Sequence, residues 1–293
     1  MHEVKINDTL VRIPSCWDEL SRKQLELVVG LASHSFEKNQ FKRCLLFYAA
    51  GIHVQELIYH NLHDRMDNLY QALLPDGNTA QLSTAQIDEI ASLFNFLFKI
   101  DNDNEFITVD SQLTVNLISH FKVSGTSFYG PADKLFNITL SEFIHAETNL
   151  TRYLKSKEIE YLDRLIAILW RPQKNPIRRI SNHYNGDRRI PFNDHKFEKR
   201  AIRIHKLNHN TKMAILLFYQ GCQAWYQKQF PHVFKPGKKA NNNLGFLNLV
   251  DALTTGDITK TDDIRKSYLM DVMVHLERVA IEHEEFESKI KKK

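Results

Sequence analysis

The chain has 293 residues, of which 43% are hydrophobic and 25% charged, which predicts a globular protein with a sizeable core in one large domain or two smaller ones. Its longest apolar run, Ala214 to Tyr219, is far too short to cross a bilayer, and the N-terminus lacks the apolar core of a signal peptide. Because Cys16, Cys44 and Cys222 form no CxxC motif, we expect reduced thiols and a cytoplasmic protein without membrane contact.

The N-terminal residues predict a short β-hairpin followed by helices. Val4 to Ile13 alternate polar and apolar residues around a turn at Asn7-Asp8, and Pro14 ends the second strand. From Trp17 onward the apolar residues recur at helical spacing, which predicts two helices before Gly51.

The next hundred residues predict two more helices and then an irregular linker. One helix is expected over Val54–Leu74, ended by the turn residues that begin at Pro75, and another after an N-cap at Ser83 or Thr84. Residues 105–135 mix β-branched pieces with Gly and Pro, so we expect a linker there between an N-terminal region, 1–104, and a C-terminal region, 136–293.

The C-terminal region predicts helical hairpins. Thr139 and Glu142 form a capping box that begins a helix over Leu140–Leu154, and a second helix over Ile159–Trp170 is cut by Pro172. A further pair is expected over 192–207 and 211–230. The predicted fold class is therefore mainly α: a bundle of helical hairpins with a short N-terminal β-hairpin and a long C-terminal helix.

A basic segment lies between these hairpins. Residues 171–206 carry eleven Lys or Arg against three acids, a surplus of eight, so with a total of +4 the rest of the chain sums to −4. Such a segment predicts contact with an acidic protein partner or with nucleic acid, whose bases could stack on the interleaved aromatic rings. Equally, these rings could anchor the loop to the core. The residues expected to make the contact are Arg171, Lys174, Arg178, Arg179, Arg188, Arg189, Lys199, Arg200 and Arg203.

The last thirty residues carry apolar side chains at alternating steps of three and four, without Gly or Pro. This heptad pattern predicts a long helix with an apolar seam. The seam either packs on the protein's own bundle or pairs between chains in an oligomer. Its residues are Leu269, Val272, Leu276, Val279, His283, Phe286 and Ile290.

No catalytic or cofactor motif stands out, so we expect a protein that is not an enzyme and has no cofactor. The glycines form no GxG or Walker motif, no serine lies in GxSxG, and no HExxH is present. Histidine pairs occur at His60/His63 and His205/His209, but two ligands do not fix a metal ion. The acidic run that begins at Asp101 lacks the glycine and glutamate of a calcium loop, so no metal site is expected.

Two stretches carry a family resemblance: Ile13-Pro14-Ser15-Cys16-Trp17-Asp18-Glu19-Leu20-Ser21, and Ile168-Leu169-Trp170-Arg171-Pro172 followed by Phe192-Asn193 and Lys199-Arg200-Ala201. They resemble uncharacterised helical proteins of bacteriophage and prophage structural modules, near tail genes. The resemblance implies a component or assembly factor of a phage-like particle, located in the host cytoplasm or in the particle. We therefore expect a non-enzymatic structural protein with protein partners, in particular other particle components.

Overall fold

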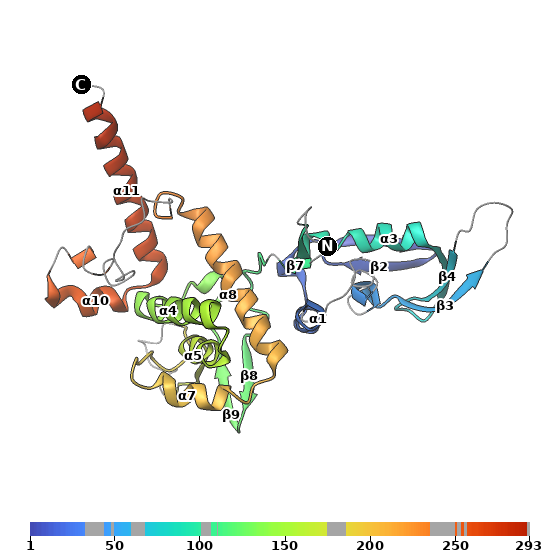
Figure 1. The fold of residues 1–293 in the computed structure, drawn as a ribbon, viewed down its shortest axis with the longest axis horizontal. Coiled ribbons are helices and arrows are strands. Elements are labelled where there is room, and N and C mark those ends of the chain that lie inside the picture. Colours follow the sequence, from blue (N-terminus) through green and yellow to red (C-terminus); the bar gives the residue numbers. More distant parts are fainter. Residues whose placement is uncertain are drawn as a thin grey trace. The chain divides into compact units, whose positions relative to one another are not determined.

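The computed structural model describes residues 1–32, 44–47, 50–59, 68–100, 107–109, 111–174, 186–234, 250, 253–254 and 257–291. The chain divides into two compact units, which we call the N-terminal unit (Met1–Leu113) and the C-terminal unit (Thr114–Lys293) (Figure 1). This division falls inside the stretch 105–135 that was expected to be an irregular linker, but strands occupy parts of that stretch.

The predicted mainly α fold class is wrong, because the fold is mixed α/β with helices predominating. The described residues contain four small antiparallel sheets, with strand orders β1-β2, β3-β4-β5, β6-β7 and β10-β9-β8. The strands are β1 (His2–Ile6), β2 (Thr9–Ile13), β3 (His53–Tyr59), β4 (Asn68–Leu73), β5 (Thr79–Ser83), β6 (Phe98–Ile100), β7 (Ile107–Val109), β8 (His120–Val123), β9 (Thr126–Tyr129) and β10 (Arg171–Pro172).

The helices include short 3₁₀ turns in both units. The α-helices are α1 (Arg22–Ala32), α3 (Thr84–Ser92), α4 (Leu140–Ser156), α5 (Ile159–Leu169), α7 (Phe197–Ile204), α8 (His209–Gln229), α10 (Thr261–Lys266) and α11 (Leu269–Lys291). The 3₁₀ helices are η1 (Trp17–Glu19), η2 (Asn95–Leu97), η3 (Asp133–Leu135) and η4 (Ile258–Lys260).

The predicted N-terminal hairpin is confirmed as β1 and β2. Ile6 pairs with Thr9 across the turn, where Asn7 adopts a left-handed φ of 53° that Asn tolerates better than most residues. Along β2, Thr9, Val11 and Ile13 are buried while the residues between them are exposed. This period of two is the pattern of a strand with one face on the core.

The predicted helix over Val54–Leu74 is wrong, since residues 54–59 and 68–73 belong to β3 and β4, neighbours in an antiparallel sheet, while residues 60–67 lie outside the described residues. β3 contains Val, Ile and Tyr, which pack well on a pleated surface. The predicted turn at Pro75 is confirmed: the Asp76 carboxylate accepts from the backbone N–H of Asn78 at 3.0 Å, and Gly77 has a φ of +86°. The strand β5 that follows this turn completes a three-stranded sheet, so neighbouring strands satisfy the backbone groups that a helix would have satisfied internally.

The predicted N-cap before α3 is confirmed at Ser83. The Ser83 hydroxyl accepts from the N–H of Gln86 at 3.3 Å, and the Gln86 side chain accepts from the N–H of Ser83 at 2.9 Å, which completes a capping box. The helix ends at Ser92, and η2 follows with Leu97 buried.

In the C-terminal unit, the sheet β10-β9-β8 packs closely at Gly130. The indole N–H of Trp170 donates to the carbonyl of Ile118 at 2.8 Å, and the side-chain amide of Asn116 donates to the carbonyl of Pro131 at 2.6 Å. A methyl group on Gly130 would lie 2.5 Å from Trp170 Nε1 and 2.6 Å from Asn116 Nδ2. Only glycine fits between these two buried side chains.

Gly130→Ala is therefore expected to lower the free energy of unfolding by about 1–3 kcal/mol, because the indole and the amide must both move from their hydrogen bonds. Urea titration followed by tryptophan fluorescence measures this loss. Ser127→Ala, at an exposed position on β9, is the control and should change stability little. Equal stability of the two variants would contradict the close packing at Gly130.

The predicted hairpin of α4 and α5 is confirmed, with one difference at its start. The Thr139 hydroxyl accepts from the N–H of Glu142 at 3.3 Å, as a capping residue should. The Glu142 carboxylate does not complete the predicted capping box, because it lies in a buried ion-pair network described below. Lys157, with a left-handed φ of 60°, ends α4, and its N–H donates to the carbonyl of Tyr153.

Candidate protein-contact site

The first two turns of α11 are anchored to the C-terminal unit. Leu269, Val272 and Met273 are buried, and the N–H of Leu269 donates to the carbonyl of Ile138 at 2.9 Å. Tyr268, just before the helix, forms an isolated β-bridge with Thr139, the cap of α4. Part of the predicted seam therefore packs on the protein's own core.

A second anchor lies one turn further along α11, where the Glu277 carboxylate contacts the residues that directly follow α8. It accepts from the backbone N–H groups of His232 at 3.1 Å and Val233 at 3.0 Å, and it contacts His232 Nδ1 at 2.5 Å. Slight burial opposes ionisation, but the hydrogen bonds from His232 and Val233 lower the pKa of Glu277 overall. These contacts hold the middle of α11 in place.

The second half of α11 leaves the core, although its apolar pattern continues. Leu276 is half-buried, whereas Val279, Phe286 and Ile290 are 45%, 64% and 58% exposed. His283, between them on the same face, is also exposed. In Figure 1 these last turns run to the C-terminus without another labelled element beside them.

We call these five residues, Leu276, Val279, His283, Phe286 and Ile290, the exposed stripe. A row of exposed apolar side chains along one helix face, unlike a single exposed one, is typical of a surface that meets a partner. The stripe continues the face that is buried in the first two turns, because both follow the same alternating steps of three and four. The predicted seam thus consists of an anchored half and an exposed half.

The basic segment is used differently from its prediction. Three of its arginines donate to the last carbonyls of α5: Arg200 Nε to Ala167 at 3.1 Å, Arg171 Nη1 to Ile168 at 3.0 Å, and Arg189 Nη1 to Leu169 at 2.9 Å. Helix α5 is apolar and buried along Leu165–Leu169, so water cannot satisfy these carbonyls. The guanidinium groups supply the missing donors and place positive charge at the negative end of the helix dipole.

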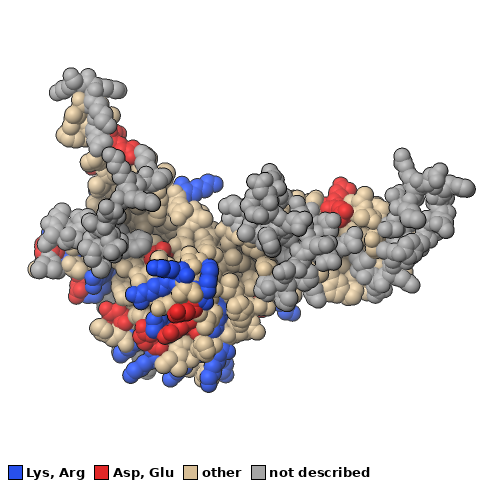
Figure 2. Space-filling view, viewed as in Figure 1, with Lys and Arg blue, Asp and Glu red and all other residues tan. Residues whose placement is uncertain are grey.

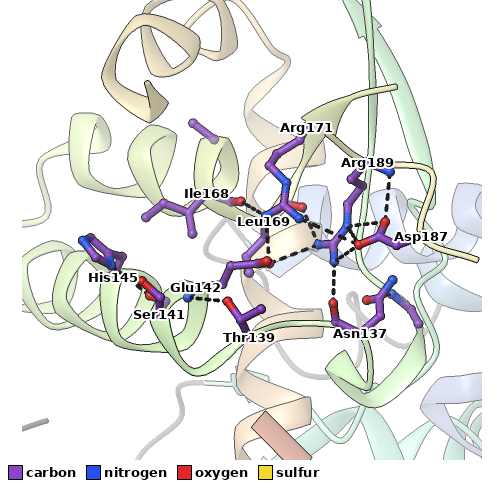
Figure 3. Close-up of polar contacts among 12 residues, drawn as sticks. Asn137, Thr139, Ser141, Glu142, His145, Ile168, Leu169, Arg171, Asp187 and Arg189 are labelled. Atoms are coloured by element: carbon purple, nitrogen blue, oxygen red, sulfur yellow. Dashed lines mark hydrogen bonds and ion pairs between the residues drawn. The ribbon is translucent and has the colours of Figure 1, made fainter. Parts of the chain in front are cut away.

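Two acids pair with Arg171 and Arg189 of this cluster (Figure 3). Glu142 Oε2 lies 2.8 Å from Arg171 Nη1 and 3.5 Å from Arg189 Nη1, and the Asp187 carboxylate accepts from Arg189 Nε at 3.0 Å and from Nη2 at 2.9 Å. Arg189 Nη2 also donates to the carbonyl of Asn137 at 2.8 Å. The network joins the starts of α4 and β10, the segment around Asn137 and the segment around Asp187.

Burial and neighbouring charges both shift the pKa values of these groups. Burial lowers the pKa of Arg171, although Glu142 opposes the change, and burial together with the charge of Arg171 lowers the pKa of Arg200 to about 10. Burial alone would raise the pKa of Asp187, but the hydrogen bonds and charge of Arg189 lower it overall. With a pKa of about 10, Arg200 stays charged at neutral pH.

The predicted polyanion or acidic-partner contact needs correction at three residues. Arg171, Arg189 and Arg200 are buried and bound within the C-terminal unit, so a partner cannot reach them. The exposed members are Arg188, Lys199 and Arg203, Lys174 is half-buried, and Arg178 and Arg179 lie outside the described residues. On the face of this unit visible in Figure 2, Lys and Arg stand among Asp and Glu and form no continuous basic surface.

A cleft of about 340 Å³ opens beside the network, between α4, α7 and α10. In it, His145 Nδ1 lies 2.8 Å from the carbonyl of Ser141, and the imidazole ring contacts Phe197. Arg152 and Arg265 also line the cleft and form no ion pair with any described residue. Arg152 and Arg265 are the charges in this cleft that suit a small anion. The third arginine of the cleft, Arg164, is paired with Glu198 at 2.9 Å.

The polar core between α4 and α8 contains a carboxyl group with a raised pKa. Burial raises the pKa of Glu147, and the hydrogen bonds that its Oε1 accepts, from the Tyr219 hydroxyl at 2.6 Å and from Gln223 at 2.5 Å, only partly oppose this. The folded state therefore holds the Glu147 proton to higher pH than the unfolded chain does. Its contribution to stability is present below the unfolded-state pKa and is lost as the pH rises through the folded-state pKa.

Glu147→Gln should remove this loss and raise the midpoint of thermal unfolding at pH 7, because the amide oxygen still accepts both hydrogen bonds without carrying charge. The advantage should shrink as the pH falls toward the unfolded-state pKa of a glutamate. Differential scanning calorimetry between pH 4 and 8 checks both statements, with the exposed Glu158→Gln as control. A variant that is less stable than the native chain at pH 7 would contradict the assignment.

Candidate metal ligands do not cluster in the described parts of the chain. Within the described parts of the chain, no three His, Cys, Asp or Glu residues lie close enough to hold a metal ion. His205 Nδ1 lies 2.8 Å from Asp163 Oδ2, and His205 forms no hydrogen bond with His209 among the described residues. His60, His63 and the acidic run after Asp101 lie outside the described residues.

Comparisons with known proteins add no further assignment, since no family model, no curated protein and no solved structure matches this chain. Among the helices that the structure describes, none has both the length and the apolar content needed to span a bilayer. A function for this chain is therefore proposed from the geometry described above and from the resemblance of its sequence motifs.

Proposed function

We propose that this chain is a non-enzymatic structural or assembly component of a phage-like particle and acts through protein-protein contacts. One observation carries the proposal: the exposed stripe on the second half of α11, which is held out on an anchored helix. Leu269 and Glu277 fix the helix in the C-terminal unit, so the stripe is presented without a large cost in ordering entropy. The sequence resemblance supports the phage-like setting.

A test in cells that make the protein naturally uses a photoreactive amino acid in place of Phe286. We expect cross-linked protein adducts from this position, because it is the most exposed aromatic residue of the stripe. Ile281 is the matched control, since it is apolar and 38% exposed on the same helix but lies outside the seam. Adducts that are absent at 286, or that are equally strong at 281, would overturn the proposed contact site.

A charge variant in the stripe tests the same partner contact by removing it. Phe286→Glu should abolish α11-dependent adducts formed from position 279 while leaving the melting temperature within about 2 °C of the native value, because an exposed side chain contributes little to the fold. Ile281→Glu should leave those adducts in place. A Phe286→Glu variant that still forms them at native yield would contradict the role of the stripe.

The alternative function is nucleic-acid binding through 171–206, which rests on the exposed Arg188, Lys199 and Arg203. It requires an affinity that falls steeply with salt and a high ratio of absorbance at 260 to 280 nm after purification at low salt. Triple replacement of these three residues by Ala should then abolish the binding. The burial of three other arginines weakens this alternative relative to the protein contact.

A further inference from the structure

We infer that the partner of the exposed stripe is a second copy of this chain, paired antiparallel along the last turns of α11. This inference rests on the proposed function, because it names the protein that covers the stripe. The charges that flank the stripe, and their spacing, fit a second copy in this orientation.

The seam assigns each residue of these turns a place in a heptad. Leu276, His283 and Ile290 share one core position, and Val279 and Phe286 share the other. Next to the core, Glu282 and Lys289 occupy one flank, seven residues apart. Ala280 and Glu287 occupy the other flank, so each flank has its own charge pattern.

An antiparallel pair matches these charges. In that orientation like flanks face each other, and the register that sets Val279 against Ile290 of the second copy also sets Glu282 against its Lys289. The two-fold symmetry repeats this contact, so two opposite-charge pairs form. His283 then packs against Phe286 of the second copy, Val279 and Ile290 form the outer layers, and Leu276 lies beyond the paired layers.

A parallel pair places the same charges against their like. Unlike flanks then face each other, which brings Glu282 opposite Glu287 of the second copy, twice. His283 would also face itself at a core position. On this helix the acids at 282, 284, 285 and 287 precede the lysines at 289 and 291. This charge order favours the same orientation, because an antiparallel partner places its acidic turn beside the basic turn of the first copy.

The test measures the dissociation constant of the full-length chain by analytical ultracentrifugation over a range of concentrations at low salt. Four chains are compared: the native chain, Glu282→Lys, Lys289→Glu and the double variant with both changes. Each single change turns two attractions into two repulsions and should weaken dimerisation roughly ten-fold. The double variant should restore the native constant, since it only exchanges the charges.

Several outcomes would overturn the inference. A native chain that is monomeric at all concentrations excludes the second copy, and a Glu282→Lys variant that dimerises more tightly indicates a parallel pair. A dimer that none of the changes affects, Phe286→Glu included, uses another surface. Cross-linking at 286 to other proteins combined with a monomeric purified chain would defeat this inference and leave the proposed function standing, whereas the absence of protein adducts at 286 would defeat the proposed function itself.

Discussion

Glu142→Ala is expected to lower the free energy of unfolding of the C-terminal unit by roughly 3–5 kcal/mol, the usual cost of removing one partner from a buried ion pair. Glu142 is 2% exposed and its carboxylate serves both Arg171 and Arg189. Without it, Asp187 alone faces two buried guanidinium groups. Neither cation can reach water without breaking its bond to a carbonyl at the end of α5, so the uncompensated charge stays in the core.

The matched control is Glu160→Ala, which also breaks a glutamate-arginine pair on the α4–α5 hairpin. Glu160 lies 2.6 Å from Arg164, but its side chain is 64% exposed, so the loss should be at most about 1 kcal/mol. Chemical denaturation at low and high salt separates the two sites further, because salt screens the exposed pair and hardly affects the buried one. Similar losses in the two variants would show that Glu142 is not in a closed, water-free network.

Asp163→Ala should cause the second large effect, again roughly 3–5 kcal/mol. Asp163 on α5 lies 2.6 Å from Lys212 Nζ, and both side chains are almost fully buried. Lys212 stands in the first turn of α8, where the helix dipole disfavours a cation, and its ammonium group also donates to the carbonyl of His205 at 3.0 Å. Removal of Asp163 leaves this lysine buried with a single neutral partner.

A double-mutant cycle tests the pair directly. Asp163→Leu combined with Lys212→Met replaces both charges by apolar groups and should recover most of the stability that Asp163→Ala loses, because no buried charge is left without a partner. His205→Ala controls for the hydrogen bond to Asp163 and should cost little, since the histidine is 65% exposed. Additive losses in the cycle would exclude a direct interaction between Asp163 and Lys212.

Several charged residues that stabilise the C-terminal unit were not predicted individually, although the chain contains a signal for them. The last five residues of α5, Leu165–Leu169, are all apolar, and Arg171 follows the helix after one residue. A fully buried helix end needs donors for its last carbonyls, and nearby arginines are the side chains that can supply them. The surplus of positive charge in 171–206 therefore reflects, in part, the capping of α5.

The sequence by itself determined those elements whose signals are local. The alternation in β2, the caps at Ser83 and Thr139 and the heptad steps of α11 act within one or two turns, so each element forms where its own residues direct it. The heptad pattern also located the stripe, because it continues unbroken from Leu269 to Ile290.

Only the tertiary structure decided the features that depend on distant neighbours. Residues 54–59 and 68–73 form strands because β4 pairs with both β3 and β5, so the choice between helix and strand depended on the neighbouring strands. Glu142 does not complete its capping box, because its carboxylate pairs with Arg171 and Arg189 in the core. Burial made some arginines of 171–206 internal caps of α5 and left others exposed. It also divided the seam of α11 into an anchored half and an exposed half. Both outcomes depend on distant neighbours, because the free energy of a side chain depends on the residues that exclude water from it.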